Sequence, residues 1–272
     1  MPDEAGPVTT FTRTGIAYDR AGPRGNHAVV LVHAGIADGR MWEPQWSALT
    51  GAYDTLRLDL RGFGDSVRVP EGELFPAGDV LDTLVELGIE RCHLVGSSLG
   101  AGVAVEVALT APERVESLLL SAPGGSLIPD LTADMTAFIE TESSALARGD
   151  LDAAVEANVI CWVDGLRRGP TDVDPAVRAA VGTMQRQAFE VPAGWDDVEE
   201  SELDPPALDR LGDVRARTLV LVGGHDVGAI HDAADRLVQG IPDVRRVDWP
   251  DVAHLPSMER PEDFLRLLRD WL

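Results

Sequence analysis

Short runs of apolar, mostly β-branched residues recur along the chain, and segments with apolar residues at helical spacing separate them. Runs with so few polar interruptions are typical of strands buried on both faces of a sheet. Their alternation with helices indicates a mostly parallel, doubly wound α/β sheet with right-handed crossovers. The predicted strands are residues 28–32, 55–60, 92–95, 115–121, 218–222 and 244–249. The pattern of residues 9–18 predicts an antiparallel hairpin at the edge of this sheet.

The alternation is interrupted between Pro123 and Arg217, where no strand pattern occurs. Apolar residues instead occur at helical spacing over residues 131–148, 151–163 and 175–190, which predicts three or four short helices. We therefore expect a core formed by residues 1–125 and 214–272, and a helical insertion formed by residues 126–213. An insertion at this point of a doubly wound sheet lies over the carboxyl ends of the strands, so we expect it to act as a cap.

Composition narrows the possible functions. With 272 residues and 44% hydrophobic content, the chain can bury a full core. Its 46 acidic and 23 basic residues give a net charge of −23, which opposes binding to nucleic acids and to anionic membrane surfaces. Every basic residue is arginine, which excludes mechanisms that need a catalytic lysine. Cys92 and Cys161 are too few for a disulfide framework or a metal knuckle, so we expect two free, buried thiols.

The sequence predicts a cytoplasmic protein. No apolar run approaches the ~20 residues of a membrane span. The first residues also lack a basic and then apolar leader. We expect a soluble monomer or homodimer that acts on a small molecule.

A candidate nucleophile lies between a predicted strand and a predicted helix. Ser98 is the central residue of the sequence Gly-Ser-Ser-Leu-Gly at positions 96–100. This is the pattern of a nucleophile elbow, in which a strand turns directly into a helix and leaves the serine exposed. The two glycines allow the crossing backbones to approach closely.

A serine hydroxyl needs a general base, and the base needs an orienting partner. Asp226 follows the predicted strand 218–222, and His254 follows the predicted strand 244–249. Both therefore lie beyond the carboxyl ends of strands, where ligands bind in open α/β sheets. His225 also lies near a strand end, but neighbouring residues there point apart, which makes it a poor partner for Ser98.

The oxyanion of a tetrahedral intermediate needs two hydrogen-bond donors. The backbone N–H of Leu99 is the expected first donor, because it directly follows the nucleophile. For the second donor we expect Gly35, with Ile36 as the alternative, in the turn after strand 28–32. His33 at the start of this turn is expected to fix the loop by hydrogen bonds.

These elements together resemble the α/β-hydrolase superfamily over essentially the whole chain. The resemblance rests on five segments in family order: residues 33–35, 59–66, 96–100, 223–226 and 253–261. It implies the α/β-hydrolase fold and acyl transfer to water, in which Ser98 attacks a carbonyl, His254 moves the proton and Asp226 orients the imidazole. It implies no metal and no cofactor. The usual His-Gly pair of the oxyanion loop is here His33-Ala34, which departs from the family pattern.

Several substrates remain open within the serine branch of this superfamily. The family includes hydrolases of carboxylic esters, lactones and thioesters, and C-C bond hydrolases of diketo acids. A small or medium ester or lactone is the expected substrate, with Ile36, Trp162 and Arg167 as candidate substrate-binding residues. If Trp162, Arg167 and the neighbouring Arg168 hold a substrate carboxylate, they favour an enol-lactone or a diketo acid. A non-catalytic small-molecule receptor on the same fold is the alternative from another functional class.

Overall fold

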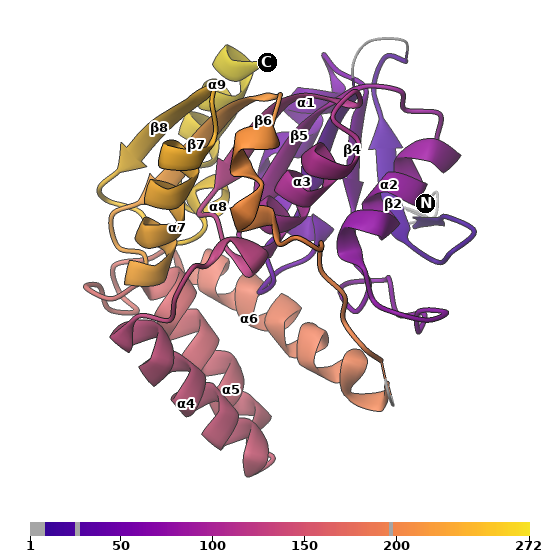
Figure 1. Ribbon diagram of the computed structural model, residues 1–272. Helices are drawn as coiled ribbons and strands as arrows, with labels where there is room; N and C mark the ends of the chain where they lie inside the picture. The colour runs from indigo at the N-terminus through magenta and orange to yellow at the C-terminus, as the bar shows by residue number, and fades with distance from the viewer. Residues whose placement is uncertain (1–8, 25–27, 196–197) are drawn as a thin grey trace, which may run out of the picture.

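The computed structural model describes residues 9–24, 28–195 and 198–272, and its centre is a sheet of eight strands (Figure 1). The strand order is β1-β2-β4-β3-β5-β6-β7-β8. β1 and β2 pair antiparallel at one edge, β2 pairs antiparallel with β4, and the remaining pairs are parallel. The predicted doubly wound sheet and its edge hairpin are therefore confirmed. The strands are β1 (Thr10–Phe11), β2 (Ala17–Ala21), β3 (Ala28–Val32), β4 (Thr55–Leu58), β5 (Cys92–Ser97), β6 (Val115–Ser121), β7 (Arg217–Gly223) and β8 (Val244–Trp249).

Three strands end elsewhere than the apolar pattern predicts. β7 is one residue longer at each end, because Arg217 still pairs with β6 and Gly223 with β8. Hydrogen bonds explain the other two differences. β4 ends at Leu58, because the N–H of Leu60 donates to the ring of His33 and not to a neighbouring strand. β5 continues to Ser97, because Gly96 and Ser97 still pair with the end of β6. β5 therefore runs directly into the turn at Ser98.

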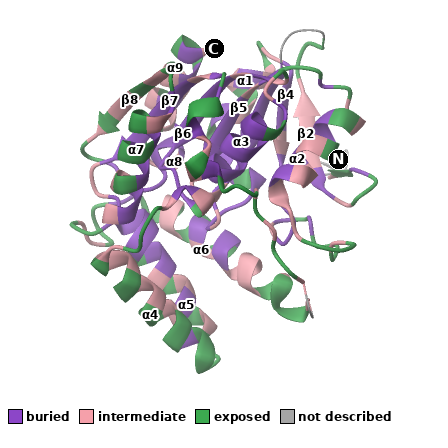
Figure 2. Ribbon diagram, in the orientation of Figure 1, coloured by how far each residue is buried: buried purple, intermediate pink, exposed green. Residues whose placement is uncertain are grey.

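Helices cover both faces of the sheet. Figure 1 shows α2, α3 and α7 in front of the sheet, with α1 and α9 behind it. α3 is mostly apolar, and its alanine, valine and glycine residues pack between the sheet and the neighbouring helices, so that residues 100–109 are buried (Figure 2). The helices are α1 (Glu43–Thr50), α2 (Pro76–Glu86), α3 (Leu99–Thr110), α4 (Ala133–Ala147), α5 (Leu151–Asn158), α6 (Pro175–Glu190), α7 (Gly228–Gly240), α8 (Pro256–Glu259) and α9 (Pro261–Trp271).

The helical insertion contains α4, α5 and α6, which lie between β6 and β7 in the chain and below the sheet in Figure 1. α5 continues into a π-helical turn, Val159–Asp164. The first turn of α4 attaches the insertion to the core, because Asp134 and Thr132 accept hydrogen bonds from the N–H groups of Gly228 and Ala229. In the part of the chain that the structure describes, no helix is long and apolar enough to span a membrane.

One buried carboxylate lies on α3, outside the candidate site. Glu106 is 5% exposed. Burial raises the pKa of Glu106, as do the nearby charges of Glu202 and Glu200, while a hydrogen bond to Ser126 opposes the shift. Because the folded state binds this proton more tightly than the unfolded state, Glu106 lowers the stability of the fold as the pH rises through its raised pKa.

The variant Glu106→Gln is therefore expected to be more stable than the wild-type chain at pH 7, because the amide carries no charge to desolvate. We expect its thermal midpoint to rise by a few degrees, on the order of the shift that ~1 kcal/mol produces in a domain of this size. The advantage should vanish below about pH 4, where the carboxyl is protonated in both states. Thermal melts of wild type, Glu106→Gln and the exposed control Glu113→Gln across this pH range test the expectation. An equal gain in both variants would point to net charge instead.

Candidate active site

Ser98 occupies a strained turn between β5 and α3. Its backbone torsions are φ 52° and ψ −115°, a region that residues with a side chain rarely adopt. A Cβ on Gly96 would collide with the carbonyl oxygen of Gly100, and a Cβ on Gly100 would collide with those of Val32 and His33. The two glycines therefore allow strand and helix to cross as the elbow pattern predicts, and Ser98 is left half-buried at the carboxyl end of β5.

A second glycine-rich turn crowds the nucleophile from the end of β6. The N–H of Ser98 donates to Ser121, and the N–H of Gly124 donates back to the carbonyl oxygen of Ser98. A Cβ on Gly124 would lie 3.0 Å from Ser98 Oγ. The sequence contains a Gly-Gly pair at positions 124–125, but its spacing gives no indication that it faces the nucleophile.

The structure joins His254 and Asp226 in a buried pair. His254 Nδ1 lies 2.8 Å from Asp226 Oδ2, and their side chains are 1% and 0% exposed. The other oxygen of Asp226 accepts a hydrogen bond from the N–H of Val227. Because a carboxylate only accepts, the proton of a neutral imidazole lies on Nδ1, and Nε2 is left as an acceptor. Asp226 follows β7 and His254 follows β8, so the pair lies at the same edge of the sheet as Ser98.

The loop after β3 lies against the elbow. The carbonyl oxygen of His33 accepts a hydrogen bond from Gly100, and a Cβ on Gly35 would lie 3.5 Å from the Leu99 side chain. Leu99 is the first residue of α3, so its N–H has no partner within the helix. Gly35 and Leu99 are therefore neighbours at the elbow, and Ile36 is buried beside Gly35. The His33 ring bonds Leu60 and Ala34, which fixes this loop.

The π-helical turn of the insertion brings Trp162 onto the histidine. The centroids of the Trp162 and His254 rings are 4.4 Å apart, and Phe138 of α4 packs edge-on against the indole at 5.2 Å. Trp162 was expected only as a substrate-binding residue, and nothing in its spacing predicts contact with the histidine. Burial raises the pKa of the neighbouring Cys161 thiol, and the charge of Asp226 adds to the shift. Cys161 is therefore not an ionised nucleophile at neutral pH.

The two arginines after this turn differ in their surroundings. Arg167 is exposed. Arg168 is mostly buried, and its guanidinium pairs with Glu259 and donates to three backbone carbonyls. The charge of Arg168 is thus already matched by a protein carboxylate.

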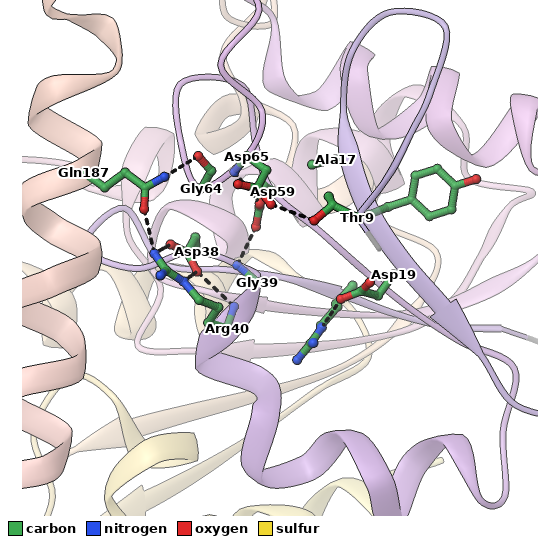
Figure 3. Close-up of a pocket in the computed structure, with 12 residues that line it drawn as sticks. Thr9, Ala17, Asp19, Asp38, Gly39, Arg40, Asp59, Gly64, Asp65 and Gln187 are labelled. Atoms are coloured by element: carbon green, nitrogen blue, oxygen red, sulfur yellow. Dashed lines mark hydrogen bonds and ion pairs between the residues drawn. The ribbon is translucent and has the colours of Figure 1, made fainter. Parts of the chain in front are cut away.

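A polar pocket of about 210 Å³ lies next to the loop after β3, where α6 approaches the core (Figure 3). Asp59 at its centre accepts hydrogen bonds from the N–H groups of Gly39 and Asp65. Gln187 of α6 bridges Arg40 and the carbonyl oxygen of Gly64. These groups satisfy one another, and the pocket contains neither Ser98 nor His254. Its contacts anchor α6 beside the loop that carries Gly35.

Comparisons with known proteins concern the family and the fold. The family model described as "Alpha/beta hydrolase family" matches residues 29–267. A 2-hydroxy-6-oxononadienedioate/2-hydroxy-6-oxononatrienedioate hydrolase of Comamonas testosteroni is 28% identical over 254 residues, which cover 90% of this chain and 87% of the relative. The 3-oxoadipate enol-lactonase 1 of Acinetobacter baylyi is 27% identical and covers 90% of this chain, with 88% of the relative matched. A carboxylesterase of Bacillus subtilis is also 27% identical, over 93% of this chain and 82% of the relative.

Solved structures share the fold. The enol-lactonase from Burkholderia xenovorans LB400 superposes with a TM-score of 0.73 at 24% identity, covering 94% of this chain and 95% of that one. At this identity the likeness establishes the architecture and leaves the substrate open.

Proposed function

The chain belongs to the alpha/beta hydrolase family, and we propose that it is a serine hydrolase that cleaves a small or medium carboxylic ester or lactone. The buried hydrogen bond between His254 and Asp226 is the observation that carries the proposal. When it is neutral, a histidine held in this way at the edge of the sheet that presents Ser98 has Nε2 free to accept a proton, as a general base requires.

The proposed reaction has two steps. Ser98 Oγ attacks the substrate carbonyl, His254 Nε2 takes the hydroxyl proton, and the N–H groups of Leu99 and Gly35 stabilise the oxyanion. His254 then returns the proton to the leaving alcohol, and an acyl ester on Ser98 remains. Water, deprotonated by His254, attacks this ester and releases the acid, while the proton returns to Ser98. Asp226 keeps its charge throughout and stabilises the imidazolium.

The surroundings of the site favour a neutral substrate over a diketo acid. Arg168 is already paired with Glu259, and Arg167 is exposed, so neither supports the carboxylate site that a diketo acid requires. Trp162 and Phe138 instead supply aromatic surface beside the histidine. Two relatives are named as a carboxylesterase and a 3-oxoadipate enol-lactonase, which supports ester or lactone cleavage. Of these two, the carboxylesterase supports a neutral substrate, because the lactone of a dicarboxylic acid keeps one carboxylate. The likeness to a C-C bond hydrolase makes diketo acids the second class to assay.

Intact-mass analysis after treatment with a fluorophosphonate probe tests the proposal. We expect one adduct per wild-type chain, and peptide mapping should locate it on Ser98. A panel of esters, lactones and vinylogous diketo acids then identifies the substrate class, with turnover of the neutral esters or lactones expected to be highest. A folded protein that stays unlabelled and hydrolyses none of the panel would contradict the proposal and favour the receptor function.

A further inference from the structure

The loop that carries His254 is held mainly from outside its own strand. β8 ends at Trp249, five positions before the histidine. The N–H of His254 donates to the carbonyl oxygen of Trp162 in the helical insertion, at 3.2 Å. The N–H of Ala253, the preceding residue, donates to Glu259 Oε1 at 2.7 Å. Two of the hydrogen bonds that hold the histidine backbone therefore come from groups outside the sheet.

Glu259 is in turn held by Arg168 of the insertion. Arg168 Nη1 lies 2.6 Å from Glu259 Oε2 and 3.1 Å from the carbonyl oxygen of Asp251, at the start of the histidine loop. Its Nε and Nη2 donate to the carbonyl oxygens of Asp164 and Val163, at 2.7 and 2.9 Å. One guanidinium thus connects the end of the π-helical turn to both ends of the loop before His254. The Arg168 and Glu259 side chains are 11% and 7% exposed, so water screens the pair little.

The same segment contacts the acid turn. The N–H of Leu166 donates to the carbonyl oxygen of His225, one residue before Asp226, at 3.1 Å. Gly165 has φ 77° and lies so close to His225 that a Cβ would reach its carbonyl oxygen at 2.5 Å. Residues 162–168 of the insertion therefore contact both loops that carry the acid-base pair.

We infer that Arg168 is a positioning residue for the general base, acting through Glu259 and the Ala253 N–H to hold the His254 imidazole in line with Ser98. The inference rests on the proposed function, since it concerns the base of that reaction. If Arg168 has this role, the catalytic site is assembled only when the helical insertion is docked on the core. This requirement is separate from any role of the insertion in enclosing the substrate. The guanidinium fits this task because its planar fork binds a carboxylate and several carbonyl oxygens at once.

The variant Arg168→Gln tests this role, because it removes the charge and leaves Glu259 as a buried, unpaired carboxylate beside the histidine loop. We expect the maximal rate of fluorophosphonate labelling at saturating probe to fall about 10- to 100-fold, as a displacement of ~1 Å in a catalytic group produces. The probe concentration for half-maximal rate should change little, since Arg168 does not face the probe. The double variant Arg168→Gln/Glu259→Gln removes the unpaired charge and should regain part of the rate.

The control is Arg20→Gln on strand β2, which lies next to the edge strand β1. Arg20 is buried to a similar degree, at 14% exposed, pairs with the buried carboxylate of Asp54, and donates to the carbonyl oxygen of Leu87. We expect the Arg20→Gln variant to have a lower thermal midpoint than the wild-type chain, but to be labelled by the fluorophosphonate at close to the wild-type rate. A maximal rate in Arg168→Gln equal to that of Arg20→Gln, or no recovery in the double variant, would overturn the inference while leaving the proposed function intact. Absence of labelling in the wild-type chain would instead overturn the proposed function, and the inference with it.

Discussion

Replacing Ser98 by alanine is expected to abolish covalent labelling by a fluorophosphonate and to lower ester or lactone turnover by a factor on the order of 10⁶. The alanine lacks the oxygen atom that forms the acyl bond. The other serine of the elbow, Ser97, is fully buried and does not replace it. Burial raises the pKa of Cys161 and of Cys92, the latter to about 12, so neither thiol substitutes as a nucleophile. Intact mass and initial rates measure the loss.

Ser97→Ala is the matched control for this variant. Ser97 precedes the nucleophile in the chain but is 0% exposed at the end of β5. Removing its buried hydroxyl leaves the elbow backbone and the His254–Asp226 pair in place. We therefore expect Ser97→Ala to be labelled at close to the wild-type rate. Retention of the adduct in Ser98→Ala, or its loss in Ser97→Ala, would place the nucleophile elsewhere.

The sheet could be predicted because its signals are local. Parallel strands covered by helices must be apolar on both faces, so the runs at residues 28–32 and 115–121 match β3 and β6 residue for residue. The elbow and the two strand-end residues Asp226 and His254 could also be predicted from the sequence, because the carboxyl ends of parallel strands all lie at one edge of the sheet. The sequence thus predicts which side chains share the edge, and the structure adds that His254 and Asp226 are hydrogen-bonded.

The contacts of the helical insertion could not be predicted in the same way. Regular helical spacing over residues 151–163 predicts one continuous helix, but the chain changes to a π-helical turn at Val159. The wider turn alters which side chains face the core. As a result Trp162 packs on the histidine, while the apolar side chain of Ile160 in the same turn is 51% exposed. The partners of Arg168 depend on this docking, so no local pattern separates it from the exposed Arg167.

Replacing Asp226 by asparagine is expected to slow labelling and turnover by a factor of about 10⁴ without unfolding the protein. The amide oxygen can keep the hydrogen bond from the Val227 N–H, which directs the amide NH₂ toward His254 Nδ1. The imidazole must then accept at Nδ1 and carry its proton on Nε2, so it has no lone pair for the Ser98 hydroxyl. The side chains are nearly equal in size, so packing around this buried position is preserved.

The control for this change is Asp232→Asn, which removes one carboxylate from an exposed position on α7. Both variants alter the net charge equally, so any loss specific to Asp226→Asn arises from the imidazole and not from the long-range field of an acidic protein. Second-order labelling rates at a fixed pH, together with thermal melts, separate the effect on the imidazole from the effect of the changed net charge. If Asp226→Asn reacts within about tenfold of the wild-type rate, then Asp226 does not orient the base, and the buried pair is a structural contact between the ends of β7 and β8.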